Sequence, residues 1–294
     1  MLGSPLVSIC CLTFNHESYI RKCLDSFMTQ KCDFDFEILI HDDASTDGTA
    51  KIIREYEKKY VDVIKPFYQT ENQYSKGLRS LGVRYNFPRA KGRYIAICEG
   101  DDFWIDPYKL QKQVDFLENN SDYILCFTDR NILINEEVQI TPYLYNTYSF
   151  DQTEIPYIHI PTLTVLFRNI KTKIPIKMLN NLIDTSLFLF LSQFGKFYYL
   201  RDKTAVYRVH DKGIYSGSSD FINFSRSASA RLSAWIYLKN IDKLALADNL
   251  IFCYRLKKDS AIKDKKYLAA LSSTMIESFF ILYLFVSKKL QKIK

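Results

Sequence analysis

The chain of 294 residues lacks several of the patterns that define common protein classes. Its seven cysteines lie mostly inside apolar runs and include no Cys-x-x-Cys pair. This argues against a disulfide framework or a zinc site and favours buried free thiols in a reducing cytosol. Residues 1–5 show no basic segment followed by a long apolar stretch, so we expect no secretory signal. No internal repeat or low-complexity tract is visible in the sequence.

The apolar run near the C-terminal end is short for a membrane span. Residues 279–286 form a run of eight apolar side chains, followed by Ser287, Lys288 and Lys289. Crossing about 30 Å of hydrocarbon takes about 20 residues. Two hypotheses remain for the helix that contains this run: it lies at a membrane interface, or it packs against the body of the protein.

Composition and charge set the remaining bounds. Apolar residues make up 47% of the chain and aromatic residues 15%, which is enough for one large core or two modest ones. The net charge of +7 is concentrated at one end, because residues 255–294 carry ten Lys or Arg against three Asp or Glu. Because the positive charge is concentrated at one end of an otherwise neutral chain, we expect this end to bind an anionic surface. Membrane lipid or a lipid-linked phosphate is favoured over nucleic acid as that partner. The alternative is a solvated helix with lysines on one side.

Residues 7–129 alternate between short apolar runs and helical patterns. Strands are predicted at residues 7–12, 36–41, 61–67, 94–98 and 124–127, and helices at residues 19–30, 49–60, 76–87 and 107–119. This βαβ succession predicts a mostly parallel, doubly wound sheet with right-handed crossovers. After a loosely patterned stretch, further strands are predicted at 161–168 and within 197–209, and helices at 183–194, 226–238, 243–257 and 265–289.

Two of the predicted strands end in acids. The run at 36–41 leads into Asp42 and Asp43, and the run at 94–98 leads into Glu99, Asp101 and Asp102. The carboxyl ends of parallel strands meet at one edge of an open α/β sheet, so we expect these acids to share a cleft. Crowded carboxylates need a cation or hydrogen-bond donors beside them, which points to a divalent metal and a nucleotide.

A set of short motifs follows in order along about residues 5–215: Val7-Ser8-Ile9, Leu12-Thr13-Phe14-Asn15, Asp42-Asp43-Ala44-Ser45-Thr46-Asp47-Gly48, Glu99-Gly100-Asp101-Asp102, Asp184 and Val206-Tyr207-Arg208-Val209-His210. With these motifs in this order, the chain resembles the family 2 glycosyltransferases, which are inverting enzymes with the GT-A fold. This resemblance implies an α/β fold of the GT-A type, here followed by a helical C-terminal extension.

The resemblance assigns the first motifs to the nucleotide. It places Thr13, Phe14 and Asn15 at the nucleotide, with the Phe14 ring stacked on the base. Asp43 then accepts a hydrogen bond from the base. Because an ionised carboxylate cannot donate, Asp43 selects a base with an imino N–H, as uracil has, which favours UDP-sugars. A core phenylalanine and a purely structural turn after Asp42 are the alternatives.

The later acids are assigned to the metal and to catalysis. Asp102 and His210 match ligands of Mg²⁺ or Mn²⁺, and Asp101 matches a contact to the ribose or to a metal-bound water. Glu99 replaces the first acid of the usual Asp-x-Asp signature, and a surface-loop histidine is the alternative for His210. Asp184 matches the base that deprotonates the acceptor hydroxyl. An ordinary helix cap is the alternative for Asp184.

These assignments predict a metal-dependent, inverting hexosyltransferase that moves a sugar from a UDP-sugar to a glycan or a polyprenyl-phosphate-linked acceptor in surface polysaccharide synthesis. We expect a nucleotide-sugar-binding half at residues 1–130, an acceptor-binding half of the same domain at 131–220, and a basic helical extension at 221–294. The expected location is the cytoplasm, peripheral to the inner face of the membrane, with no nucleic-acid partner. A sugar-nucleotide nucleotidyltransferase needs a glycine-rich loop that residues 13–17 lack. A non-catalytic scaffold that binds metal or nucleotide leaves Phe14 unexplained.

Overall fold

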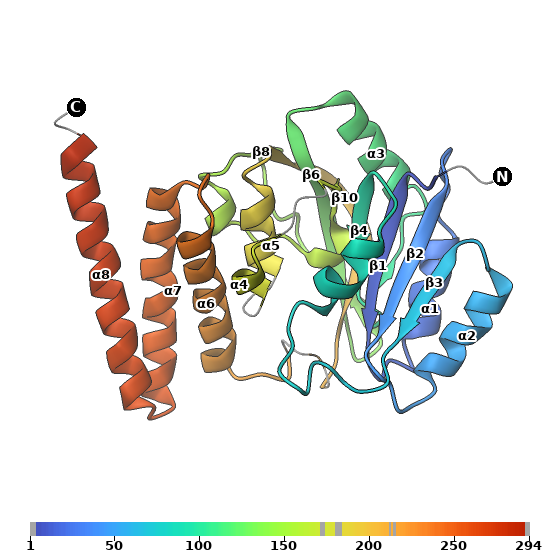
Figure 1. Cartoon of the computed structure of the whole chain (residues 1–294), viewed down its shortest axis with the longest axis horizontal. Helices are drawn as coiled ribbons and strands as arrows, with labels where there is room; N and C mark the ends of the chain where they lie inside the picture. Colours follow the sequence, from blue (N-terminus) through green and yellow to red (C-terminus); the bar gives the residue numbers. More distant parts are fainter. Residues whose placement is uncertain (1–3, 171–173, 180–183, 212, 214–215, 292–294) are drawn as a thin grey trace. The chain divides into compact units, whose positions relative to one another are not determined.

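The computed structural model describes residues 4–170, 174–179, 184–211, 213 and 216–291. The chain divides into two compact units (Figure 1). Unit 1 comprises Met1–Ser149, Ile160–Thr172 and Lys196–His210, and unit 2 comprises Phe150–His159, Lys173–Gly195 and Asp211–Lys294.

A mixed sheet is the basis of unit 1. Within the described residues it has ten strands in the order β3-β2-β1-β4-β9-β6-β10-β5, with β7 paired to β6 and β8 to β10. The strands are β1 (Val7–Thr13), β2 (Phe36–Asp42), β3 (Ile64–Tyr68), β4 (Tyr94–Ile97), β5 (Phe103–Trp104), β6 (Tyr123–Ile134), β7 (Glu137–Gln139), β8 (Ser149–Phe150), β9 (Leu166–Arg168) and β10 (Lys196–Val209). The pairs β1–β2, β1–β4, β2–β3 and β6–β10 are parallel.

The parallel strands β1, β2 and β4 are buried along nearly their whole length, which explains their largely apolar sequences, whereas β3 at the edge of the sheet is partly exposed. The side chains of Val7, Ile9, Ile38, Ile40 and Tyr94 are fully buried. The connections between strands are α1 (Ile20–Met28), α2 (Thr49–Lys59), the π-helix η1 (Gly82–Asn86), the 3₁₀ turns η2 (Phe87–Arg89) and η4 (Thr162–Thr164), and α3 (Lys109–Asn119). Burial of both faces by these connections gives the sheet its core.

Unit 2 is mainly helical. Its elements are the 3₁₀ turn η3 (Ile155–Tyr157), α4 (Ile176–Leu179), α5 (Asp184–Leu191), α6 (Asp220–Tyr237), α7 (Lys243–Lys263) and α8 (Tyr267–Gln291). Helix α7 lies between α6 and α8 (Figure 1). By length and composition, one helix of the described chain could cross a membrane: the segment Tyr267–Lys289 of α8, whose most apolar window is 28% buried.

The predicted α/β fold with its helical extension is confirmed, and most predicted elements are present within a few residues. The predicted helix at 76–87 is wrong in its first half, because Gly77 and Ser80 have left-handed backbones (φ +89° and +61°) that interrupt a right-handed helix. The chain forms a turn there and becomes helical at η1. The predicted strand at 161–168 is also shorter, since η4 occupies its first half.

Unit 1 also contains a buried lysine. Lys109 is fully buried, and its ammonium group donates to Gln113 Oε1 (2.7 Å) and lies 4.3 Å from the centre of the Trp104 ring. Gln113 Nε2 in turn donates to the carbonyls of Cys126 and Thr164, both at 2.9 Å. Burial lowers the pKa of Lys109 from 10.5 to about 7.

Because the pKa of Lys109 differs between the folded and unfolded states, the free energy of unfolding depends on pH. Comparison with the variant Lys109→Met tests this dependence. Above the folded pKa the native state has released the proton that the unfolded chain still binds, so wild-type stability gains with rising pH. Relative to Lys109→Met, the unfolding free energy of the wild type should rise by about 1.4 kcal/mol per pH unit from about pH 7 to about pH 9. Denaturant unfolding of both proteins across this range measures the difference. A difference that stays constant would mean that Lys109 titrates as an ordinary lysine.

Candidate functional site

The carboxyl ends of β1, β2 and β4 meet at one edge of the sheet in unit 1. Thr13, the last residue of β1, lies opposite Asp42 in the parallel pairing with β2. Just beyond the strands, the Asp43 N–H donates to the Thr13 carbonyl (3.0 Å) and the Gly100 N–H to the Leu12 carbonyl (2.9 Å). The two acidic segments therefore lie along the same edge, as expected for parallel strands.

Strand β10 brings a later part of the chain to this edge. It runs parallel to β6, and β9 lies between β6 and β4 and is antiparallel to both. β6 and β10 therefore run in the same direction as β4. The carboxyl end of β10, followed by His210, consequently lies at the edge where the acids lie.

The loop after β1 is braced against the loop after β2. Asn15 has a left-handed backbone (φ +54°), which asparagine adopts more readily than most residues. Its N–H donates to Ser45 Oγ (2.9 Å), and its Oδ1 accepts from the Thr46 N–H (2.8 Å). Phe14, just before it, is 40% exposed. Asn15 thus holds the two loops together beside an exposed aromatic ring, and nucleotide contacts by either residue stay a prediction.

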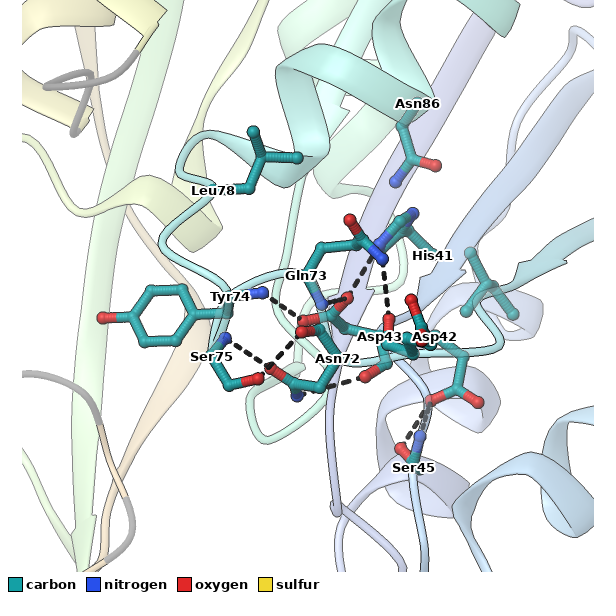
Figure 2. A network of polar contacts seen from close by, with 12 residues as sticks. His41, Asp42, Asp43, Ser45, Asn72, Gln73, Tyr74, Ser75, Leu78 and Asn86 are labelled. Carbon is teal, nitrogen blue, oxygen red and sulfur yellow. Dashed lines mark hydrogen bonds and ion pairs between the residues drawn. The ribbon is translucent and has the colours of Figure 1, made fainter.

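Asp43 is buried and hydrogen-bonded at both carboxylate oxygens (Figure 2). Its Oδ1 accepts from the Gln73 N–H (2.9 Å) and its Oδ2 from the Tyr74 N–H (3.0 Å). Asn72 Nδ2 donates to the Asp43 carbonyl (3.1 Å), while Asn72 Oδ1 accepts from the Ser75 N–H (2.6 Å). Asp43 therefore organises the segment 72–75. A carboxylate has about four acceptor positions, so capacity for a further donor remains.

The two residues before Asp43, His41 and Asp42, are buried as well, and Figure 2 shows their side chains beside it. Asp42 Oδ1 accepts from the Ser45 N–H (3.3 Å) and from Ser45 Oγ. Burial raises the pKa of Asp42, and the bonds from Ser45 oppose this rise only in part. His41 Nε2 lies 3.7 Å from Asp43 Oδ1, and its ring stacks on Tyr85 with centres 4.6 Å apart. Burial lowers the pKa of His41 to about 4, so its imidazole is neutral at pH 7.

The second acidic segment turns tightly after β4. A Cβ at Gly100 would lie 2.7 Å from Thr13 Oγ1, so the closeness of the two strand ends requires glycine here. Asp102 is buried, and its Oδ1 accepts from the Arg208 N–H (2.8 Å). Burial and the neighbouring acids raise the pKa of Asp102 well above its ordinary range, against the opposing effect of Arg208. One oxygen of this predicted metal ligand is thus occupied by a backbone amide.

Asp101 lies beside two imidazoles. Its Oδ2 is 3.1 Å from His210 Nε2 and 3.7 Å from His16 Nε2, and the Tyr19 ring packs on His210 with centres 4.9 Å apart. Burial by itself raises the pKa of Asp101, but the hydrogen bond with His210 and the charge interaction with His16 lower it overall. The resemblance to the family predicts that His210 and Asp102 bind the metal together, and it assigns no role to His16. The structure brings both histidines to Asp101.

Arg208 links β10 to the acidic turn and is a further site residue that the sequence did not identify. Its Nε donates to the Asp101 carbonyl (3.0 Å), in addition to the bond between its N–H and Asp102. Its guanidinium lies 4.6 Å from the centre of the Tyr19 ring and 5.7 Å from that of Phe103. One residue therefore fixes both acids, and its place two residues before His210 was the one local signal of this role.

The donor set at this edge fits a metal that is shared with a ligand. No three His, Cys, Asp or Glu side chains within the described ranges form a group that could hold a metal ion. Mg²⁺ at nucleotide sites usually has one or two protein ligands and completes its shell with phosphate oxygens and water. A carboxylate and an imidazole, as Asp101 and His210 supply, suit Mn²⁺ in such a role. The residues present therefore fit a divalent ion that binds together with a diphosphate.

The predicted base, Asp184, belongs to unit 2. It is the first residue of α5 and is exposed, whereas Ser186 to Leu191 behind it are buried. Ile183, which precedes it, lies outside the described residues. Asp184 thus lies at the exposed start of a helix whose later residues are buried, and its role as base stays a prediction.

Comparisons with known sequences point to a single family. The model of Glycosyl transferase family 2 matches residues 8–174. An uncharacterized protein of Mycobacterium tuberculosis (strain ATCC 25618 / H37Rv) is 33% identical over 218 residues, which cover 71% of this chain and 60% of that protein. The "Putative teichuronic acid biosynthesis glycosyltransferase TuaG" of Bacillus subtilis (strain 168) is 31% identical over 141 residues, which cover 48% of this chain and 53% of that protein. The chain thus spans about 60% of the length of the mycobacterial relative.

Solved structures share the fold. Staphylococcus aureus TarS 1-349 in complex with UDP matches with a TM-score of 0.60 at 17% identity, over 84% of this chain and 70% of that one. The mannosyltransferase PcManGT of Pyrobaculum calidifontis, solved with GDP-Man and Mn²⁺, matches with a TM-score of 0.61 at 15% identity, over 95% and 86%. Because the family model covers more than half of the chain and the sheet has the same architecture, the chain belongs to glycosyltransferase family 2 and has the GT-A fold.

Proposed function

We propose that the chain transfers a hexose from a UDP-sugar, in a metal-dependent reaction that inverts the anomeric carbon. The proposal rests on one observation: the carboxylates at this edge of the sheet have two different kinds of hydrogen-bond partner. Asp43 is held by backbone amides, whereas Asp101 is paired with His210. The first arrangement suits a nucleobase that donates an N–H, and the second suits a cation that accompanies a diphosphate.

Donor recognition on this proposal uses the loops at the ends of β1 and β2. The exposed ring of Phe14 offers a stacking surface for the base. The remaining acceptor capacity of Asp43 takes the imino N–H of uracil. The UDP bound to TarS supports a uridine donor, while the GDP-Man bound to PcManGT makes guanosine the alternative to be tested.

The chemistry needs a proton acceptor and a way to stabilise the leaving group. Bound Mg²⁺ or Mn²⁺ would supply positive charge against the departing diphosphate, and Asp101 and His210 would hold it. Asp184 takes the proton of the acceptor hydroxyl as its oxygen forms a bond to the anomeric carbon. The bond between that carbon and the diphosphate oxygen breaks at the same time, and UDP leaves with the electron pair.

The acceptor is a glycan or a polyprenyl-phosphate-linked glycan in surface polysaccharide synthesis, at the cytoplasmic side of the membrane. The name of the Bacillus subtilis relative, which refers to teichuronic acid biosynthesis, supports this assignment.

Titration calorimetry of UDP, with and without Mn²⁺, tests the donor. UDP should bind at least about tenfold more tightly with Mn²⁺, because the ion links the diphosphate to the protein. CDP should bind more weakly than UDP, since N3 of cytosine carries no hydrogen. A preference for GDP would overturn the uridine assignment, and no binding of any of the three would overturn the proposal of a nucleotide-sugar donor.

Asp101→Asn tests the metal contact. It should remove most of the Mn²⁺-dependent gain in UDP affinity and lower the rate of transfer by about 10²- to 10³-fold, while metal-free binding of UDP stays unchanged. Asp106→Asn is the matched control, because this nearby acid pairs with Lys112 instead. Asp102→Asn keeps an acceptor for the Arg208 N–H. Loss of metal dependence in that variant, with Asp101→Asn unaffected, would move the contact to Asp102.

Asp184→Asn tests the base. Turnover should fall by about 10²- to 10⁴-fold with UDP affinity retained, because proton transfer is lost and the donor site is not touched. Asp220→Asn is the control, since Asp220 is likewise an exposed acid at the start of a helix in unit 2. Equal activity of the two variants would reduce Asp184 to a helix cap.

A further inference from the structure

Helix α8 has two apolar faces. Ala270, Ser273, Glu277, Phe280 and Leu284 recur at helical spacing and are buried within unit 2. A second stripe at the same spacing remains between 45% and 85% exposed. This outer stripe consists of Leu268, Leu271, Met275, Phe279, Leu282 and Val286. A row of apolar side chains over five helical turns exceeds the scattered exposed apolar residues of ordinary surfaces.

The buried face of α8 is fixed in place. Glu277 is 7% exposed, accepts from Arg255 Nε (2.6 Å) and lies 3.0 Å from Lys258 Nζ, both on α7. Phe280 is also buried and packs edge-on against Trp235 of α6, with ring centres 5.2 Å apart. Rotating α8 to bury the outer stripe would break both ion pairs of Glu277 and expose Phe280, which now packs on Trp235, so one apolar face would replace another with the ion pairs lost. The outer stripe is therefore a stable part of the surface of unit 2.

The same contacts argue against a membrane-spanning α8. Glu277 ties α8 to α7, which carries Arg255, Lys257, Lys258 and Asp259 within about one turn. Such a helix does not enter hydrocarbon, because each charge in the bilayer centre costs several kcal/mol. A helix that lies in the plane of the membrane buries its outer face and keeps its inner face on the protein.

Charge indicates what covers the outer stripe. Lys263, Lys265 and Lys266 precede α8 together with Asp264, which pairs with Lys266, so this cluster keeps a net charge of +2. Lys288 and Lys289 end α8, and Glu277 is the one charged residue of the sequence between the two clusters. At about 1.5 Å per residue, the two basic clusters lie about 30 Å apart. A second copy paired through this stripe would bring lysine clusters together in either direction. Anionic lipid headgroups complement both clusters at once.

We propose that the outer stripe of α8 docks the chain onto an anionic lipid bilayer. The apolar side chains enter the boundary between headgroups and acyl chains, and the lysines at both ends of α8 contact lipid phosphates. This docking is independent of the proposed transfer reaction, since it uses no residue of the edge that holds Asp43 and Asp101.

Sedimentation with vesicles tests the proposal. The wild type should partition at least about tenfold more strongly onto phosphatidylcholine vesicles with about one third phosphatidylglycerol than onto pure phosphatidylcholine, and high salt should weaken it. The variant Leu271→Gln/Met275→Gln/Leu282→Gln keeps the charge and should partition at least about tenfold less. Val61→Gln/Val138→Gln/Ile140→Gln removes three exposed apolar side chains of unit 1 and should partition as the wild type.

Three results would overturn the docking surface. They are a folded wild type that ignores anionic vesicles, a stripe variant that binds like the control, and a wild-type dimer that the stripe variant converts to a monomer in light scattering. The last would identify a second copy as the occupant. Melting curves show whether the stripe variant folds. Should it unfold, Lys288→Glu/Lys289→Glu must lower partitioning onto anionic vesicles by a similar factor, and unchanged partitioning would overturn the proposal.

Discussion

Parallel pairing of β1 with β2 and β4 brings carboxylates to one sheet edge, and their mutual repulsion has to be offset without moving them. The partners that offset these acids come from segments distant in the sequence. Asp43 accepts from the amides of the segment 72–75, Asp102 from the amide of Arg208, and Asp101 lies beside His210 and His16. Two of these three partners depend on the end of β10, so the edge is complete only when β10 has paired with β6. Formation of the site is therefore coupled to closure of the sheet.

The kind of partner decides what each acid can do. Backbone amides do not titrate and are held by the fold, so they fix the direction in which the Asp43 carboxylate accepts hydrogen bonds. The imidazoles beside Asp101 are side chains that can turn toward a cation, and a neutral imidazole is itself a metal ligand. Arg208 leaves the Asp101 carboxylate available for a cation. Its N–H donates to Asp102 and its guanidinium donates to the Asp101 carbonyl, so it fixes the acidic turn without occupying the carboxylate of Asp101. A base-binding acid and a cation-binding acid can thus share one edge.

Local pattern was sufficient for the strands and for the acids at their ends. The runs of β1, β2 and β4 are mostly apolar because these strands are buried, and the acidic segments begin where the strands end. The buried polar residues Ser8 and Glu37 inside β1 and β2 are hydrogen-bonded to each other. The pattern failed at 76–81, where the left-handed Gly77 and Ser80 break an otherwise helical sequence. It also missed His16 beside Asp101. That contact follows from the spatial order β4-β9-β6-β10 together with the loop after β1, and no local spacing encodes such an order.

The orientation of helix α8 could also not be predicted from the local sequence pattern. Apolar residues on both of its faces cancel the one-sided pattern from which a buried face is usually inferred, so the sequence left packing and interfacial placement equally open. One polar residue, Glu277, determines which face of α8 packs on the protein. Glu277 needs the cations of α7, and satisfying them orients the helix and leaves the outer stripe exposed whatever its apolar content. The pairing of one buried carboxylate with partly exposed cations can therefore determine which apolar surface is available for binding.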